Sequence, residues 1–368
     1  MSDCLLEVRI RKQLRSFALE TAFETGSGCL GILGPSGCGK SMTLKSIAGI
    51  VCPDSGTIRL KTDSGHKEQI FYDSDRRVHV SPQKRKVGYL FQNYALFPNM
   101  TVEQNIAVGL KHHADRHRII REMVERFRLN GLEQQYPGKL SGGQQQRVAF
   151  ARMLAYEPKV MLLDEPFSAM DTHLRERLRL ELLEVIKEYP GISIMVTHDR
   201  DEAYQLCDHL LLMEEGKVIR AGKTRDIFEN PATVTAARLT GCKNISRIER
   251  LGEYRVKALD WEGLELTTMS KVNDSITNIG IRAHDFEPLS ESEAAKIRSC
   301  EDSNLVPVQA PQISEMPFEW YVMLQNGIWW KKEKNMHVHE AKEIIPAWLR
   351  VKPSAILLLQ SGQAKRDR

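Results

Sequence analysis

Hydrophobic and polar residues alternate with period two over the first thirty positions. The stretches LLEVRI (5–10) and FALETAF (17–23) place apolar side chains at every second residue. Such alternation predicts strands with one buried face. Phe17 and Phe23 are also candidates to stack on an adenine ring, but alternation is first of all a packing signal, so both remain core candidates as well.

Helices and strands then alternate as far as about residue 240. Continuous apolar runs are typical of strands buried on both faces. They cover residues 29–33, 87–91, 160–163 and 192–196. Helical spacing follows the first run, fills residues 93–158 and returns at 174–189, and residues 210–222 predict a hairpin. The polar, basic stretch 61–86 predicts a surface excursion.

The pattern changes after residue 240, where short alternating runs separated by turns replace the helix–strand order. We therefore predict two domains: residues 1–240, with a helical subdomain at about 93–158, and a small all-β barrel or sandwich at 241–362. Residues 289–303 predict a polar connection inside the second domain. Residues 363–368 predict a disordered tail.

Composition adds limits to this picture. The 368 residues carry 52 basic and 48 acidic side chains, a net charge of +4 that is too balanced to indicate a nucleic-acid partner. No apolar run reaches the length of a membrane span, and the N-terminus lacks the apolar core of a signal peptide. The seven scattered cysteines contain no C-x-x-C and predict reduced thiols.

The chemistry centres on GPSGCGKS, which matches G-x-x-x-x-G-K-[ST] between a predicted strand and a predicted helix. Glycines let backbone N–H groups surround phosphate oxygens, and the helix N-terminus favours an anion. Lys40 can reach terminal phosphates and Ser41 can bind Mg²⁺. The predicted nucleotide-binding residues of this loop are Gly34, Pro35, Ser36, Gly37, Cys38, Gly39, Lys40, Ser41 and Met42. Cys38 is either a small filler or a thiol that makes the loop sensitive to thiol reagents.

Three further groups extend the candidate site. LSGGQ (140–144) predicts a serine-capped helix start and hence a second anion site. Asp164 and Glu165 end a buried strand, where ligands of α/β sheets bind; an aspartate there can hold Mg²⁺ and a glutamate can polarise water. His198 follows the next buried strand and is a candidate γ-phosphate contact.

The sequence also contains LFQNYALFP, MLLDEPFSAMD and MVTHD. With these motifs in this order, the chain resembles the nucleotide-binding subunits of ABC transporters. The resemblance covers about residues 5–240. It implies an α/β P-loop NTPase cassette that binds ATP and Mg²⁺ and works as a dimer enclosing two ATP molecules. It also implies a membrane permease as partner and, indirectly, an external solute-binding protein.

The same resemblance implies roles for individual residues. Ser41, Gln92 and Asp164 would hold the metal, and Glu165, His198 and Gln92 would be the catalytic set. Glu165 would be the base, His198 the switch histidine and Gln92 the Q-loop glutamine. The signature residues Ser141, Gly142, Gly143 and Gln144, with Asp171 of the D-loop, would contact the nucleotide of the other subunit. SAMD stands where the family more often has SALD, and no adenine-stacking aromatic stands at the usual distance upstream.

The C-terminal region resembles the OB-like regulatory domains (TOBE or MOP type) of importer ATPases, and CKNIS with ISEMPFEWYVMLQNGIWWK is most similar to those for molybdate and sulfate. The resemblance ranks molybdate first, then tungstate, sulfate, and iron, polyamine or sugar. Lys243, Arg282 and His284 are either oxyanion contacts or surface charges.

We expect the protein to bind at the cytoplasmic face of the membrane. Residues 93–99 (NYALFPN) would either dock on the permease or pack in the core. A soluble ABC ATPase of translation or DNA repair is the alternative class, and a purely oxyanion-sensing C-terminal domain is a third.

Overall fold

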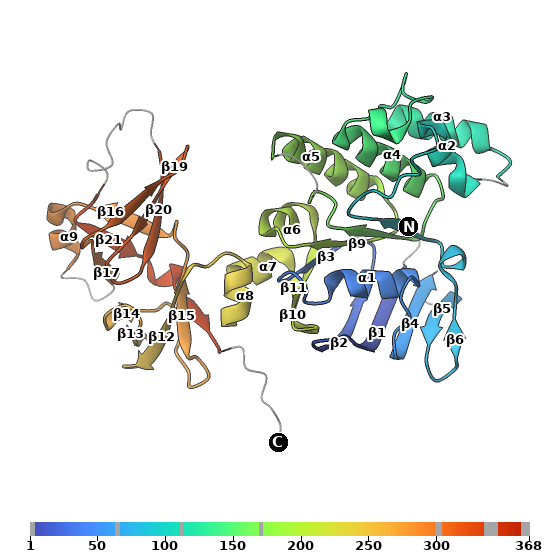
Figure 1. Cartoon of the computed structure of the whole chain (residues 1–368). Coiled ribbons are helices and arrows are strands. Elements are labelled where there is room, and N and C mark those ends of the chain that lie inside the picture. Colours follow the sequence, from blue (N-terminus) through green and yellow to red (C-terminus); the bar gives the residue numbers. More distant parts are fainter. Residues whose placement is uncertain are drawn as a thin grey trace. The chain divides into compact units, whose positions relative to one another are not determined.

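The computed structural model describes residues 4–62, 67–110, 113–168, 172–298, 304–334 and 345–361. The chain forms two compact units, Met1–Arg225 and Asp226–Arg368 (Figure 1). This division falls earlier than the predicted boundary after residue 240. Helix α8 (Val234–Leu239) accounts for the difference, because Ala237 packs with Cys242 and Leu359 of the second unit. The predicted tail, 363–368, lies outside the described residues.

The first unit alternates strands with helices, as its apolar pattern predicts. Its strands are β1 (Leu5–Gln13), β2 (Ala18–Thr25), β3 (Gly28–Leu33), β4 (Ser55–Thr62), β5 (Lys67–Asp73), β6 (Val78–His79), β7 (Val87–Leu90), β8 (Val160–Asp164), β9 (Ile192–Thr197), β10 (His209–Glu214) and β11 (Lys217–Lys223). Its helices are α1 (Lys40–Ala48), α2 (Val102–Ala107), α3 (Arg116–Arg126), α4 (Gly142–Leu154), α5 (Thr172–Glu188), α6 (Arg200–Leu206) and the first residues of α7 (Thr224–Glu229). Short 3-10 turns lie at Pro82–Lys84, Val108–Leu110 and Pro137–Lys139.

These strands form one mixed sheet with the order β6-β5-β4-β1-β2-β11-β10-β3-β9-β8-β7 in the described part of the chain. The strands β10, β3, β9, β8 and β7 are mutually parallel, and β1, β2, β4 and β5 pair antiparallel. The carboxyl ends of the parallel strands therefore meet at one edge, where open α/β sheets bind their ligands.

The parallel strands are buried on both faces, and their residues divide cleanly between two cores. One face meets α4, α5 and the helical subdomain, and the other meets α1 and the antiparallel strands (Figure 1). The buried residues on the first face are Cys29, Leu90, Met161, Leu163 and Met195. The buried residues on the second face are Leu30, Ile32, Val160, Leu162, Ile192, Ile194, Val196, Leu211 and Met213. The predicted α/β cassette with a helical subdomain is confirmed.

The structure corrects the prediction that residues 61–86 form a surface excursion. This stretch contains β5 and β6, and both Phe71 and Arg85 are fully buried. Arg85 donates hydrogen bonds to the carbonyl oxygens of Val80, Ser46 and Ile47, at 2.8–2.9 Å, and its guanidinium lies 5.6 Å from the centre of the Phe71 ring. Burial lowers the pKa of Arg85 to about 10. A single arginine therefore caps the carboxyl end of α1 from inside the core, as the helix dipole favours.

The second unit is built almost entirely of short strands. They are β12 (Asn244–Arg250), β13 (Arg255–Ala258), β14 (Leu264–Thr267), β15 (Asn278–Ile281), β16 (Phe286–Leu289), β17 (Asn304–Pro307), β18 (Gln312–Glu315), β19 (Glu319–Met323), β20 (Trp329–Glu333), β21 (Trp348–Val351) and β22 (Leu357–Leu359), with a 3-10 turn at Pro353–Ala355. Three sheets, β14-β13-β12-β15-β22, β16-β21-β17 and β18-β19-β20, enclose a core that includes Trp261, Trp320 and Trp330. This mainly β unit is consistent with the predicted OB-like domain.

One helix of this unit was missed. Residues 289–303 were predicted as a polar connection, yet α9 spans Glu291–Ile297 within it. Ser290 and Glu293 form a capping box, in which each side chain bonds the backbone N–H of the other residue. The S-x-x-E spacing was visible in the sequence and is the signal that predicts this helix start.

Replacing Arg85 by leucine should destabilise the first unit by about 2–3 kcal/mol, because buried carbonyl oxygens lose a charged donor. Far-UV circular dichroism during urea unfolding measures this, since most helices lie in this unit. Tryptophan fluorescence reports only the second unit, which holds all five tryptophans. Arg9→Leu is the control: its pair with Glu24 is exposed, so the cost should stay below about 1 kcal/mol. Equal losses in the two variants would contradict the capping role.

Candidate active site

The phosphate-loop residues connect β3 to α1 and occupy backbone positions that need glycine. A Cβ on Gly34 would lie 2.3 Å from the carbonyl oxygen of Met213, and Gly39 has a φ of +106°. Lys40 is buried, and its Nζ donates to the carbonyl oxygens of Gly34 and Pro35, each at 2.8 Å. The ammonium group thus lies against the loop that a triphosphate would enter.

The predicted metal-binding residues Ser41 and Asp164 meet directly. Ser41, in the first turn of α1, donates from Oγ to Asp164 Oδ1 at 2.7 Å. Asp164 ends β8 and is buried. A hydroxyl and a carboxylate oxygen are the hard ligands that Mg²⁺ prefers, so this pair fits the ion. The other oxygen, Oδ2, accepts a hydrogen bond from the Tyr89 hydroxyl at 2.8 Å, a contact that the sequence pattern did not reveal.

Glu165 and His198 also come together. Glu165 follows β8 with a φ of +47°, a backbone conformation that side-chain-bearing residues rarely adopt. Its N–H donates to the Val196 carbonyl oxygen of β9, which fixes the turn. Glu165 Oε1 lies 3.4 Å from Nδ1 of His198, which follows β9. Strained residues of this kind cluster at functional sites.

Gln92 lies two residues beyond β7, with an exposed side chain. Leu90 of β7 pairs with Leu163 of β8, so Gln92, just after β7, and Asp164, the last residue of β8, lie at the ends of neighbouring strands at the same sheet edge. The fold therefore places all the predicted catalytic and metal-binding residues of the cassette at or beside one edge of the sheet.

The predicted second anion site is a well-formed helix start. Ser141 caps α4 and shares a capping box with Gln144: Gln144 N–H donates to Ser141 Oγ at 3.3 Å, and Ser141 N–H donates to Gln144 Oε1 at 2.9 Å. Ser141 and Gly142 are exposed, whereas Gly143 is buried. Gln146 of the same helix donates from Nε2 to the Pro166 carbonyl oxygen at 3.2 Å, just after Glu165. Asp171 lies outside the described residues.

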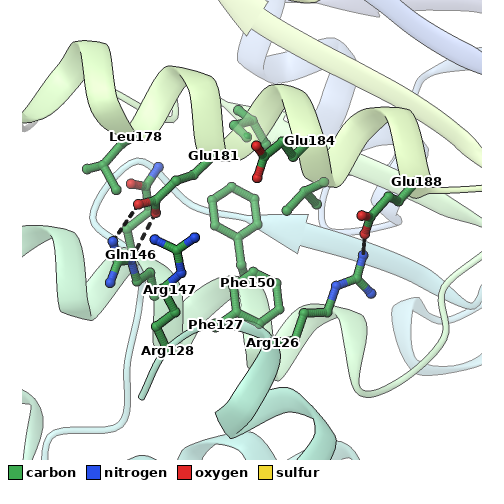
Figure 2. Close-up of a pocket in the computed structure, with 12 residues that line it drawn as sticks. Arg126, Phe127, Arg128, Gln146, Arg147, Phe150, Leu178, Glu181, Glu184 and Glu188 are labelled. Atoms are coloured by element: carbon green, nitrogen blue, oxygen red, sulfur yellow. Dashed lines mark hydrogen bonds and ion pairs between the residues drawn. The ribbon is translucent and has the colours of Figure 1, made fainter. Parts of the chain in front are cut away.

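A cavity of about 130 Å³ lies between α4 and α5 (Figure 2). The rings of Phe127 and Phe150 stack beside it with centroids 6.3 Å apart. Arg147 of α4 holds Glu181 of α5 through two hydrogen bonds, at 2.9 and 2.5 Å. These contacts connect the helix that begins at the second anion site to α5, and the cavity lining contains none of the predicted nucleotide-binding residues.

Phe17 and Phe23 have different surroundings. Phe23 lies in β2 and is buried in the core. Phe17 is half-buried beside the phosphate loop, since Cβ atoms built on Gly39 and Gly216 would lie 3.6 and 2.6 Å from its ring. Adenine stacking thus remains a prediction for Phe17. Burial raises the pKa of the Cys38 thiol, which disfavours the reactive thiolate.

Comparison with known proteins agrees with this geometry. The ABC transporter family model matches residues 21–168. The sulfate/thiosulfate import ATP-binding protein CysA of Synechocystis sp. is 38% identical over 271 residues, which cover 72% of this chain and 70% of that protein. This chain belongs to the ABC transporter ATPase family. CysA 2 of Chromobacterium violaceum is 44% identical over 226 residues, 60% of this chain and 58% of the relative.

A solved structure has the same fold: cbiO1 from Clostridium perfringens, part of the ABC transporter complex cbiONQ. It is 27% identical, with a TM-score of 0.51, and the match covers 61% of this chain and 91% of that one. The ATPase assignment therefore rests on both sequence and fold. The family match ends before the second unit, so the likeness of that unit to TOBE or MOP domains stays a prediction.

The predicted oxyanion contacts of the second unit each have protein partners in the structure. Arg282 donates to the carbonyl oxygens of Thr240 and Phe228, so it closes the ends of α8 and α7. Lys243 lies over the rings of Tyr321 and Trp329, at 4.4 and 5.6 Å. The exposed His284 lies 3.5 Å from Asp285. Arg282 is therefore better explained as a helix cap than as an anion ligand.

Proposed function

We propose that this ABC ATPase drives import of a tetrahedral oxyanion through a membrane permease. The observation that carries the catalytic part is the meeting of Ser41, Asp164 and Glu165 at the carboxyl edge of the sheet beside Lys40. The printed names of several relatives, sulfate/thiosulfate import ATP-binding proteins, support the transport part.

In this proposal the triphosphate of ATP occupies the loop before α1. Lys40 exchanges its hydrogen bonds to Gly34 and Pro35 for the phosphate oxygens, so that its charge is already inside the loop when the nucleotide arrives. Glu165 accepts the proton of the attacking water, because its carboxylate follows Asp164 at the same edge of the sheet. His198 contacts Glu165 and keeps that carboxylate oriented toward the nucleotide.

Ser41 and Asp164 would hold Mg²⁺, with Gln92 nearby on the neighbouring strand end. When bound, this ion neutralises charge on the β- and γ-phosphate oxygens. The Ser41–Asp164 distance of 2.7 Å supports this assignment, since both oxygens already share one small volume.

We infer that two copies of the chain complete the site. The signature residues Ser141, Gly142, Gly143 and Gln144 form a capped helix start whose first two residues are exposed, which suits a phosphate. Within one described chain Ser141 and Gln144 bond each other. A second copy would present this helix start to the nucleotide of the first. Asp171 would join the same interface.

The surface around residues 97–108 is the proposed permease contact. Tyr94 and Leu96 pack in the core, whereas Phe97, Met100 and Val108 are exposed. Asn105, fully buried, bonds the backbone of Phe97, Met100 and Thr101 and so keeps this loop in shape. A hollow of about 550 Å³ lies beside it, lined in part by Met100, Ala107 and Val108. An apolar segment of a cytoplasmic permease loop would fit such a surface, and the proposed contact would put the ATPase at the cytoplasmic face of the membrane.

Sulfate or thiosulfate is the first substrate to test, because it stands in the names of the relatives. Molybdate is the second candidate, favoured by the CKNIS and WYVMLQNGIWWK segments of the second unit. An external solute-binding protein would deliver either oxyanion to the permease.

Glu165→Gln should reduce ATP turnover at least about 100-fold, because the water loses its general base. Phosphate release measures turnover, and a fluorescent ATP analogue measures binding, which should be retained since glutamine keeps the shape of the side chain. Glu188→Gln, remote on α5 and paired with Arg126, is the matched control and should turn over at the wild-type rate. Turnover of Glu165→Gln within a few-fold of wild type would remove the assigned role.

Phe97→Glu should weaken the permease contact without changing the site chemistry. We expect co-purification with the membrane partner and solute uptake to fall at least about tenfold, because a charge replaces apolar contact area, while ATP hydrolysis by the isolated chain stays normal. Leu180→Glu changes another exposed apolar residue, on α5, and serves as the control. Unchanged co-purification of the Phe97 variant would exclude this surface.

Cells that lack this gene should lose uptake of labelled sulfate and thiosulfate, and the wild-type gene should restore it whereas the Glu165→Gln form should not. Labelled molybdate is measured in parallel, with tungstate as competitor. Loss of molybdate uptake alone would shift the substrate to molybdate. Normal uptake of all three would overturn the oxyanion proposal and leave the ATPase assignment in place.

A further inference from the structure

Both carboxylate oxygens of Asp164 are engaged, and only one partner comes from the recognised motifs. Ser41 Oγ donates to Oδ1 at 2.7 Å, and the Tyr89 hydroxyl donates to Oδ2 at 2.8 Å. The tyrosine therefore occupies the side of the carboxylate that faces away from the phosphate-loop serine. Such a contact is the second-shell support that metal-binding carboxylates commonly receive.

Tyr89 is held rigidly enough to serve this purpose. It lies in β7, where its backbone pairs with Leu162 of β8, two residues before Asp164. Its ring packs against Phe91 with centroids 4.5 Å apart, and its side chain packs with the core on the α1 side of the sheet. Asp164 shares this side with Leu162, because strand residues alternate between faces.

The geometry also gives the direction of this hydrogen bond. The Tyr89 hydroxyl is the donor, and Asp164 Oδ2 accepts from it at 2.8 Å. Hydrogen bonds to a carboxylate belong to the stronger class when the carboxylate carries its charge.

We propose that Tyr89 is a positioning residue for the metal site: its hydroxyl holds Asp164 Oδ2 so that Oδ1 stays directed at Ser41. This rests on the proposed Mg²⁺ role of Ser41 and Asp164. A carboxylate free at Oδ2 can rotate about its last side-chain bond, whereas the tethered one meets the incoming ion in a fixed orientation. Tyr89 contributes to metal affinity without touching the phosphate loop.

Tyr89→Phe removes the hydroxyl and keeps the ring. The full-length chain is titrated with a non-hydrolysable ATP analogue, once with Mn²⁺ as the metal probe and once in EDTA, and the ratio of the two affinities measures metal coupling. We expect Tyr89→Phe to reduce this ratio about tenfold, the lower end of the losses seen for second-shell changes, with affinity in EDTA unchanged. The electron paramagnetic resonance spectrum of the bound Mn²⁺ should change as well.

Tyr189→Phe is the matched control, because its hydroxyl donates to the Pro158 carbonyl oxygen at 2.7 Å, away from Asp164. It should keep the wild-type ratio and spectrum. Tyr89→Met, which also lacks a donor, should reproduce the defect of Tyr89→Phe.

Each remaining outcome has a distinct meaning. If the wild-type chain shows no metal coupling, the proposed Mg²⁺ site itself is wrong. If the wild type is coupled and Tyr89→Phe keeps the ratio within twofold, the positioning role of Tyr89 is overturned. Equal loss of affinity with Mn²⁺ and in EDTA also overturns it, because the hydroxyl would then support the loop rather than the metal.

Discussion

The carboxylate of Asp164 is the point on which the candidate site depends, because it joins three elements that are far apart in the sequence. It ends β8, accepts from Ser41 at the start of α1, and accepts from Tyr89 of β7. Parallel pairing makes this possible, since β3, β9, β8 and β7 all end at one edge. The phosphate loop, Glu165, His198 and Gln92 are placed beside this carboxylate by the same register.

Glu165, the residue after Asp164, has a strained backbone conformation that its neighbours stabilise. Glu165 adopts a φ of +47°, which costs a side-chain-bearing residue on the order of 1–3 kcal/mol. Its N–H bonds the Val196 carbonyl oxygen, and both the N–H and the hydroxyl of Ser168 bond the Glu165 carbonyl oxygen. The surrounding hydrogen bonds thus offset the strain.

The sequence was a good guide wherever the signal is local. Apolar runs predicted β3, β8 and β9, and the glycines and Lys40 identified the phosphate loop without any tertiary information. Sequence reasoning failed where a residue acts through neighbours that are distant in the chain. Arg85 looked like one of several surface cations, yet it caps α1 from the core; Tyr89 looked like an ordinary strand residue; and Arg282, a candidate anion ligand, closes two helix ends instead. Helix α9 differs, because its capping box was present in the sequence and was overlooked.

The start of α4 shows how one residue can serve both fold and site. Ser141 Oγ accepts from Gln144 N–H, which uses a lone pair and satisfies one of the first N–H groups of the helix. A hydroxyl has two acceptor lone pairs and one donor, so the cap leaves its proton available for an anion. The exposed backbone of Gly142 carries no side chain that would obstruct such an anion. Under the proposed dimer, the hydroxyl that caps α4 in one chain therefore still has a proton to donate to a phosphate held by the other.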